Sequence, residues 1–152
     1  MNSIKDLRPK KNGRYSQGYI NASSCKKLFE SCRTQPIIYR SSWEKKFIYW
    51  CEHSNKVKQW GSECVNISYY NPLDKKTHRY YPDFVVQLTD GSVLIVEIKP
   101  YNQTVKPVNE NSWAMTTYCK NSAKWKALKE ACDRKGYRFC ILTEHTISRI
   151  TA

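Results

Sequence analysis

The sequence predicts a single α/β domain in which a helix, three strands, a second helix and a last strand follow a basic N-terminal arm. Three observations support this fold class: a helical apolar stripe near the start of the domain, a well-patterned β-hairpin at 79–99, and a long helical pattern that ends at Gly136 before an apolar strand. The chain has 152 residues, which is enough for one domain with a substantial hydrophobic core.

The basic arm is expected to comprise residues 1–40, and the α/β domain residues 41–152. The arm holds nine Lys or Arg residues and two acidic residues, separated by Gly, Ser, Asn and Pro. This composition is typical of an irregular segment that contacts a polyanion.

The first helix is predicted at about 42–53, where apolar residues recur at helical spacing, namely at Trp43, Phe47, Trp50 and Cys51. Ser41 and Glu44 form the Ser-x-x-Glu pattern of a capping box at its start. Glu44 therefore has two interpretations that do not exclude each other. It caps the helix, or it supplies an acid to a site beside the hairpin.

The remaining elements are a strand at about 57–71, which ends in a turn, and a helix at 112–135 that Gly136 terminates. A last strand is predicted at 137–143. Because a crossover helix joins parallel strands, we expect this strand to lie parallel to a hairpin strand and in the centre of the sheet.

The hairpin at 79–99 has two possible registers. A two-residue loop would place Asp83 opposite Ile98 and would mix charged and apolar side chains on both faces. A three-residue loop, 89–91, separates the two faces and puts Gly91 where a left-handed backbone is needed. We therefore expect the three-residue loop, with one apolar face made of Phe84, Val86, Leu88, Leu94, Val96 and Ile98.

In this register Asp83 lies opposite Glu97, and Lys99 projects from the same face. Directly opposed Cβ atoms are roughly 4.5–5.5 Å apart, so the two carboxylates repel unless a proton, Lys99 or a divalent cation separates them. Hard oxygen ligands suit Mg²⁺ or Mn²⁺, which bind one or two carboxylates together with a substrate phosphate. The alternative is an exposed hairpin with an ordinary Asp and a Glu/Lys pair.

The charge of the chain points to a polyanionic partner. There are 26 Lys plus Arg against 13 Asp plus Glu, a net charge of +13, which favours nucleic acid and leaves an anionic membrane surface as the alternative. No apolar run approaches the roughly 20 residues that cross a bilayer, and no signal peptide is visible. The seven cysteines include no Cys-x-x-Cys pair, so we expect reduced thiols, with a zinc site built from distant residues as the alternative.

The hairpin motif carries a resemblance. Pro82-Asp83, followed after thirteen residues by Glu97-Ile98-Lys99, resembles the PD-(D/E)xK nuclease signature. The predicted order of helices and strands is also that of the common core of these nucleases, a mixed sheet with helices on both faces. The segments "RYSQGYI", "IIYRSSWEKKFIYWCEHSNKVKQWGSE", "HRYYPDF", "VEIKPYNQT" and "FCILTE" resemble the head completion proteins of tailed phages, a branch of this superfamily, with TnsA-type nucleases as the next relatives.

The resemblance implies roles for five residues on and near the hairpin. Asp83 and Glu97 would bind Mg²⁺ or Mn²⁺, and the backbone carbonyl of Ile98 would join them. Glu44 would complete the metal site directly or through water. Lys99 would orient or deprotonate the attacking water.

The other implied residues are less closely tied to the motif. Gln103 falls where such nucleases often keep a polar residue near the site, and Glu63 is expected to be peripheral. The DNA backbone would be gripped without sequence readout by basic residues of the arm and the first helix. These are Arg14, Lys26, Lys27, Arg40, Lys45 and Lys46.

The expected function is that of a metal-dependent DNA endonuclease that processes packaged DNA during phage head completion, before the tail joins. Capsid or neck proteins would be its partners, in the host cytoplasm during assembly or in the virion head. One alternative is a structural DNA-binding head protein that does not cleave. A junction or transposon-end nuclease is the other.

Overall fold

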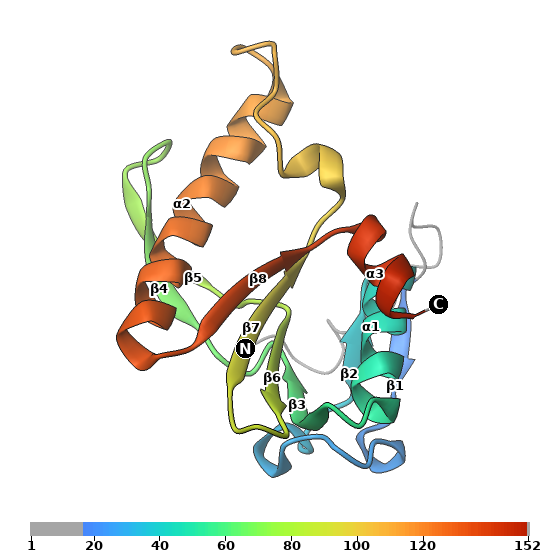
Figure 1. The fold of residues 1–152 in the computed structure, drawn as a ribbon. Coiled ribbons are helices and arrows are strands. Elements are labelled where there is room, and N and C mark those ends of the chain that lie inside the picture. The colour runs from blue at the N-terminus through green and yellow to red at the C-terminus, as the bar shows by residue number, and fades with distance from the viewer. Residues whose placement is uncertain (1–16, 152) are drawn as a thin grey trace.

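The computed structural model describes residues 17–151 (Figure 1), so the predicted DNA contact of Arg14 lies outside the described residues. The helices are α1 (Ser42–His53), α2 (Trp113–Lys135) and α3 (Glu144–Ile150), and the 3-10 turns are η2 (Ala22–Ser24), η3 (Glu30–Cys32) and η4 (Tyr101–Gln103). The strands are β1 (Gly18–Ile20), β2 (Ile37–Tyr39), β3 (Val57–Ser62), β4 (Ile67–Asn71), β5 (Lys76–Tyr80), β6 (Phe84–Leu88), β7 (Val93–Ile98) and β8 (Arg138–Leu142).

A four-stranded mixed sheet forms the centre of the molecule, in the order β3-β6-β7-β8. The first three strands are antiparallel, and β8 is parallel to β7. Helices α1 and α3 cover one face and α2 covers the other (Figure 1). The predicted α/β class and the parallel crossover are confirmed, but the central position of the last strand is wrong. It lies at the edge because, among the described strands, it pairs only with β7 and none pairs with its other side.

The hairpin of β6 and β7 has the predicted register. Phe84 pairs with Val96, and the Leu88 N–H donates to the Ser92 carbonyl across the loop at 2.8 Å. Gly91 has a φ of 90°, which is the left-handed conformation that this loop requires. The face predicted to be apolar packs against α1 and α3 in the main core.

The single strand predicted at 57–71 is wrong, because the chain forms two strands there. Glu63 has a φ of 49°, which turns the chain out of the central sheet after β3. Its N–H donates to the Asp83 carbonyl at 3.0 Å. Strand β4 then pairs with β5 in a separate two-stranded sheet that packs against α2.

Residues 17–40 are packed against the domain rather than irregular. Strands β1 and β2 pair antiparallel, and residues 26–29 run beside β3. The Phe29 N–H donates to the Trp60 carbonyl at 2.8 Å, and the Trp60 N–H donates to the Lys27 carbonyl at 3.0 Å. This part of the predicted arm contributes four buried residues to the main core, namely Ala22, Cys25, Leu28 and Ile37.

The ends of the two longer helices follow the predicted signals. Ser41 accepts the Glu44 N–H at 3.1 Å at the start of α1, and Gly136 ends α2 with a φ of 72°. Within residues 17–151, no helix combines the length and apolar character needed to cross a membrane.

Candidate active site

Two acidic side chains lie together where β6 begins and β7 ends. Asp83, immediately before β6, accepts the Ile98 N–H through Oδ2 at 2.8 Å. The Asp83 N–H points to Glu97 Oε2 at 3.4 Å, and Glu97 is only 4% exposed. The backbone of each strand therefore fixes the carboxylate carried by the other, as the opposed pairing of the two residues predicts.

Lys99 brings a positive charge to this pair. Its Nζ lies 3.6 Å from Glu97 Oε1, and its side chain is 30% exposed. The Lys99 N–H donates to the Leu142 carbonyl at 3.0 Å and so extends the pairing of β7 with β8. The lysine thus reaches solvent from one side of a buried carboxylate.

Glu44 joins the acids from the first turn of α1. It accepts the Arg40 N–H at 2.8 Å, while its own N–H is bound by Ser41. Burial, followed by the negative charge of Asp83, raises the pKa of Glu44 to about 7. Ser41 caps α1 by accepting the Glu44 N–H, whereas the Glu44 carboxylate binds the Arg40 N–H, one residue before the cap, and not the Ser41 N–H that a capping box would use. The carboxylate of Glu44 also lies within electrostatic reach of Asp83.

Burial also raises the pKa values of the hairpin acids. For Asp83 the negative charge of Glu97 adds to the effect of burial. For Glu97 the charge of Lys99 opposes the effect of burial without cancelling it. The positive charges of Lys99, Arg40 and Lys124 do not fully compensate the three carboxyl groups, whose pKa values stay raised, so the cluster favours binding of a proton or a cation.

A divalent metal fits the donor chemistry of this cluster. Asp83, Glu97 and Glu44 offer carboxylate oxygens, which are the hard ligands that Mg²⁺ or Mn²⁺ prefers. The negative charge of these carboxylates is not fully compensated by nearby cations. In the described arrangement the carboxylates bind backbone N–H groups or face Lys99 instead. Across residues 17–151, no three His, Cys, Asp or Glu side chains converge closely enough to hold a metal ion.

Glu63 and Arg40 form an ion pair at the edge of the cluster. Besides the bond from the Glu63 N–H to Asp83, the charge of Glu63 adds to the effect of burial on the pKa values of Glu44 and Asp83. Glu63 therefore lies closer to the acids than the sequence led us to expect. Arg40, predicted to grip DNA, is engaged by Glu63 in this arrangement.

Sequence reasoning did not find three residues that lie around Glu97. The Tyr80 hydroxyl and the Trp125 Nε1–H are buried side-chain groups, and the Tyr80 hydroxyl lies close enough to Glu97 and Trp125 to interact with both. Burial and the charge of Glu97 raise the pKa of Tyr80. Lys124 of α2 lies with its Nζ 5.2 Å from the centre of the Tyr80 ring. Lys124 precedes Leu128 by four residues and so shares the buried face of α2, but this spacing does not show which part of the sheet that face covers.

Of the other predicted site residues, Gln103 is exposed in η4, and no side-chain contact joins it to the acids in the described part of the chain. The Lys27 Nζ donates to the Ser54 carbonyl at 2.6 Å, and Lys46 is exposed.

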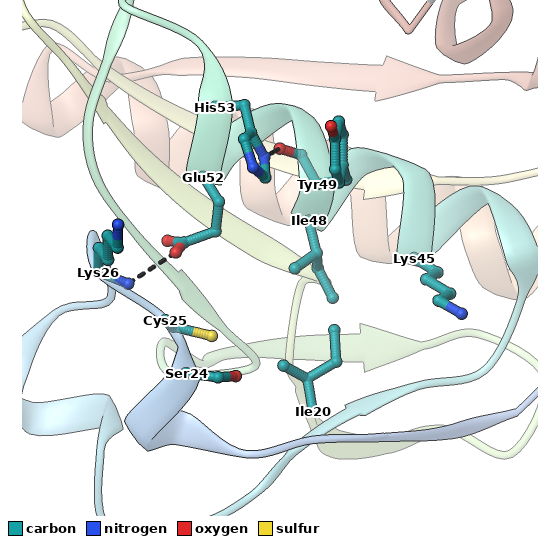
Figure 2. Close-up of a pocket in the computed structure, with 9 residues that line it drawn as sticks. All are labelled: Ile20, Ser24, Cys25, Lys26, Lys45, Ile48, Tyr49, Glu52 and His53. Atoms are coloured by element: carbon teal, nitrogen blue, oxygen red, sulfur yellow. Dashed lines mark hydrogen bonds between the residues drawn. The ribbon is translucent and has the colours of Figure 1, made fainter.

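Lys26 and Lys45 line a pocket of about 300 Å³ beside α1 (Figure 2). The side chains of Ile20 and Ile48 also line this pocket and point toward each other (Figure 2). The Lys26 N–H donates to Glu52 Oε1 at 2.6 Å at the other end of the pocket from Lys45.

Comparison with known proteins identifies the family of the chain. Residues 54–144 match the family described as "TnsA-like endonuclease N terminal", a range that includes Asp83, Glu97 and Lys99. The chain is 35% identical to the head completion nuclease of Enterobacteria phage T4 over 118 residues, which cover 71% of this chain and 79% of that protein. The mixed sheet and its covering helices are the restriction-endonuclease-like core of PD-(D/E)xK nucleases. The chain therefore belongs to the TnsA-like endonuclease family.

Proposed function

We propose that the chain is a metal-dependent DNA endonuclease whose active site is the cluster of Glu44, Asp83, Glu97 and Lys99. The observation that carries this proposal is the buried pairing of Asp83 with Glu97, with the Lys99 ammonium 3.6 Å from Glu97. The net charge of +13 supports a DNA substrate, because a strongly basic surface attracts phosphate backbones.

Asp83 and Glu97 would hold Mg²⁺ or Mn²⁺, with the backbone carbonyl of Ile98 and the carboxylate of Glu44 as further ligands. When bound, such a metal polarises the phosphate and lowers the pKa of a water molecule. Lys99 would orient the attacking water and stabilise the negative charge that develops on the phosphate. Gln103, which is exposed in η4, would contact the bound DNA next to the site.

Glu44 would release a proton when the metal binds. Its pKa of about 7 in the metal-free protein leaves the carboxyl partly protonated near neutral pH, and a carboxyl group has to be deprotonated to bind a metal. Its position in the first turn of α1 holds it beside Asp83, so this role does not require a change of backbone conformation.

We further propose that the biological role is head completion in a tailed phage, in which packaged DNA is processed before the tail joins. This proposal rests on the similarity to the T4 protein, whose name states that role. Its partners would be packaged DNA and capsid or neck proteins. It would act in the host cytoplasm during assembly or in the virion head.

The test is cleavage of linear, circular and branched DNA by the wild type, Glu97→Gln and Lys99→Met, with and without Mg²⁺ or Mn²⁺. Glu130→Gln is the matched control, because Glu130 is an exposed acid on α2. We expect metal-dependent cutting by the wild type and the control. Both site variants should lose roughly 100-fold or more, the scale of removing one preorganised group from a transition state.

Two other outcomes would change the conclusion. If the wild type binds every DNA form but cuts none with either metal, the chain is a structural DNA-binding head protein. If only branched DNA is cut, the chain is a junction nuclease with the same active site. Full activity in Glu97→Gln would show that the hairpin is not the active site.

A further inference from the structure

Lys124 is held beside the acid cluster without a carboxylate partner. It lies half-buried on α2, and its ammonium is placed over two aromatic rings, 5.2 Å from the centre of Tyr80 and 5.8 Å from the centre of Tyr69. Among residues 17–151, no Asp or Glu oxygen lies within ion-pair distance of it. Cation–π contacts thus position the charge but leave its N–H groups without an anionic acceptor.

Two other lysines lie close enough to Lys124 to repel it. Burial, followed by the positive charges of Lys120 and Lys99, lowers the pKa of Lys124. Lys120 lies one turn earlier on the same face of α2, and Lys99 follows β7. Three ammonium groups therefore lie within electrostatic reach of one another beside the acids, and Glu97 and Asp83 offset their effect on Lys124 only in part.

The acids and the lysines favour ligands of opposite charge. The acids attract a cation, and a cation bound there would increase the electrostatic repulsion on the lysines. An anion bound between the lysines would reduce this repulsion. In a protein that acts on DNA, the anion nearest to a bound scissile phosphate is the next phosphate along the backbone.

We propose that Lys124, positioned by Tyr69 and Tyr80, binds the DNA phosphate adjacent to the scissile one, with Lys120 contacting the backbone further out. This inference rests on the proposed nuclease site and adds a substrate-positioning residue from α2 to it. The competing explanation is structural, namely that Lys124 only covers the two tyrosine rings and offsets the charge of Glu97.

DNA binding separates these explanations without requiring cleavage. We would measure the affinity of duplex DNA for the wild type, Lys124→Met and Lys126→Met over a range of salt concentrations in EDTA. Methionine keeps the chain length and the apolar contact with the rings. Lys126 is the control, because it is exposed on the opposite side of the same helix.

We expect the slope of log K against log salt to become less steep by about 0.9 in Lys124→Met, as loss of one phosphate contact predicts. Lys126→Met should keep the wild-type slope, and Lys124→Arg should restore it. An unchanged slope in Lys124→Met, with a folded protein by circular dichroism, would overturn the inference. An equal change in Lys126→Met would also overturn it.

A second measurement locates the contact on the substrate. A neutral methylphosphonate would be placed at each position flanking the cut, and single-turnover cleavage would be compared between the wild type and Lys124→Met. At one adjacent position the wild type should lose rate, while Lys124→Met should lose nothing further. If the methylphosphonate lowers the cleavage rate of Lys124→Met at every position by the same factor as that of the wild type, the assignment is contradicted.

The two proposals fail in different ways. Absence of cleavage by the wild type would remove the nuclease function, while the salt slopes would still report whether Lys124 contacts DNA. An active wild-type enzyme with no effect of Lys124→Met on the slope would remove the Lys124 contact alone.

Discussion

The carboxyl group of Glu44 makes the stability of the metal-free protein depend on pH. Its pKa is about 7 in the folded chain against an ordinary value of 4.5, so the folded state holds a proton more tightly than the unfolded state does. The free energy of unfolding therefore falls as pH rises between these two values. The raised pKa values of Asp83 and Glu97 act in the same direction.

We predict that the wild type in EDTA melts at a lower temperature at pH 8 than at pH 5.5. Glu44→Gln should show a smaller difference, because it removes one of the three groups responsible. Differential scanning calorimetry at the two pH values measures this, with Glu130→Gln as the exposed control. The same pH difference in Glu44→Gln and in the wild type would contradict the raised pKa.

The tyrosine and lysine beside Glu97 show which part of the site the sequence could reveal. Asp83, Glu97 and Lys99 belong to one hairpin, so alternation along two paired strands was sufficient to place them on one face. Tyr80 and Lys124 come from other elements. Their proximity to Glu97 depends on how α2 crosses the sheet, which no local pattern reports.

At the scale of elements, Glu52 joins three segments of the chain. Its carboxylate accepts the N–H groups of Lys26 at 2.6 Å and Lys27 at 3.0 Å, and Trp60 Nε1–H at 2.7 Å. These bonds tie Lys26 and Lys27 to the end of α1 and to β3. The Glu52 side chain is charged and two of its donors, Lys27 N–H and Trp60 Nε1–H, are partly buried, so these two bonds stabilise the fold more than a surface contact does.

We predict that Glu52→Ala lowers the free energy of unfolding by about 2–4 kcal/mol, because it leaves two partly buried donors, Lys27 N–H and Trp60 Nε1–H, without an acceptor. Glu52→Gln, which keeps one oxygen, should lose less. Urea denaturation measures both, and Glu30→Ala serves as the control. The Glu30 side chain is 92% exposed and pairs only with Arg33 among the described contacts, so its loss should stay within about 0.5 kcal/mol.

The elements that the sequence predicted well are those with strong local signals. The hairpin register followed from the separation of its faces, and the ends of α1 and α2 followed from Ser41 and Gly136. The break between β3 and β4 had no such signal, since Glu63 adopts a left-handed backbone that is uncommon for a glutamate. The edge position of β8 depends on strand order, which alternation along one strand does not encode.

At the scale of the whole molecule, the excess of basic residues should dominate DNA affinity. We predict binding with little sequence preference and an affinity that falls steeply between 50 and 200 mM salt, on the order of 10³-fold if about six phosphates are contacted. Fluorescence anisotropy with two unrelated duplexes measures both properties. Salt-independent binding would contradict an electrostatic interface.

Deleting residues 1–16 provides a comparison within the same experiment. The segment carries Lys5, Arg8, Lys10, Lys11 and Arg14 against Asp6. If it contacts DNA, as the sequence predicts for Arg14, the truncated chain should bind with a less steep salt dependence. An unchanged slope would assign the interface to the remaining basic residues.

The segment at residues 26–29 also determines how copies of this protein can aggregate. An unpaired strand edge is a template for another chain, since its N–H and carbonyl groups can extend the sheet. At β3 the hydrogen bonds between Trp60 and residues 27 and 29 already occupy that edge. Within residues 17–151, the central sheet therefore offers only its β8 edge for the addition of another strand. Edge-to-edge aggregation of this sheet would have to start at β8.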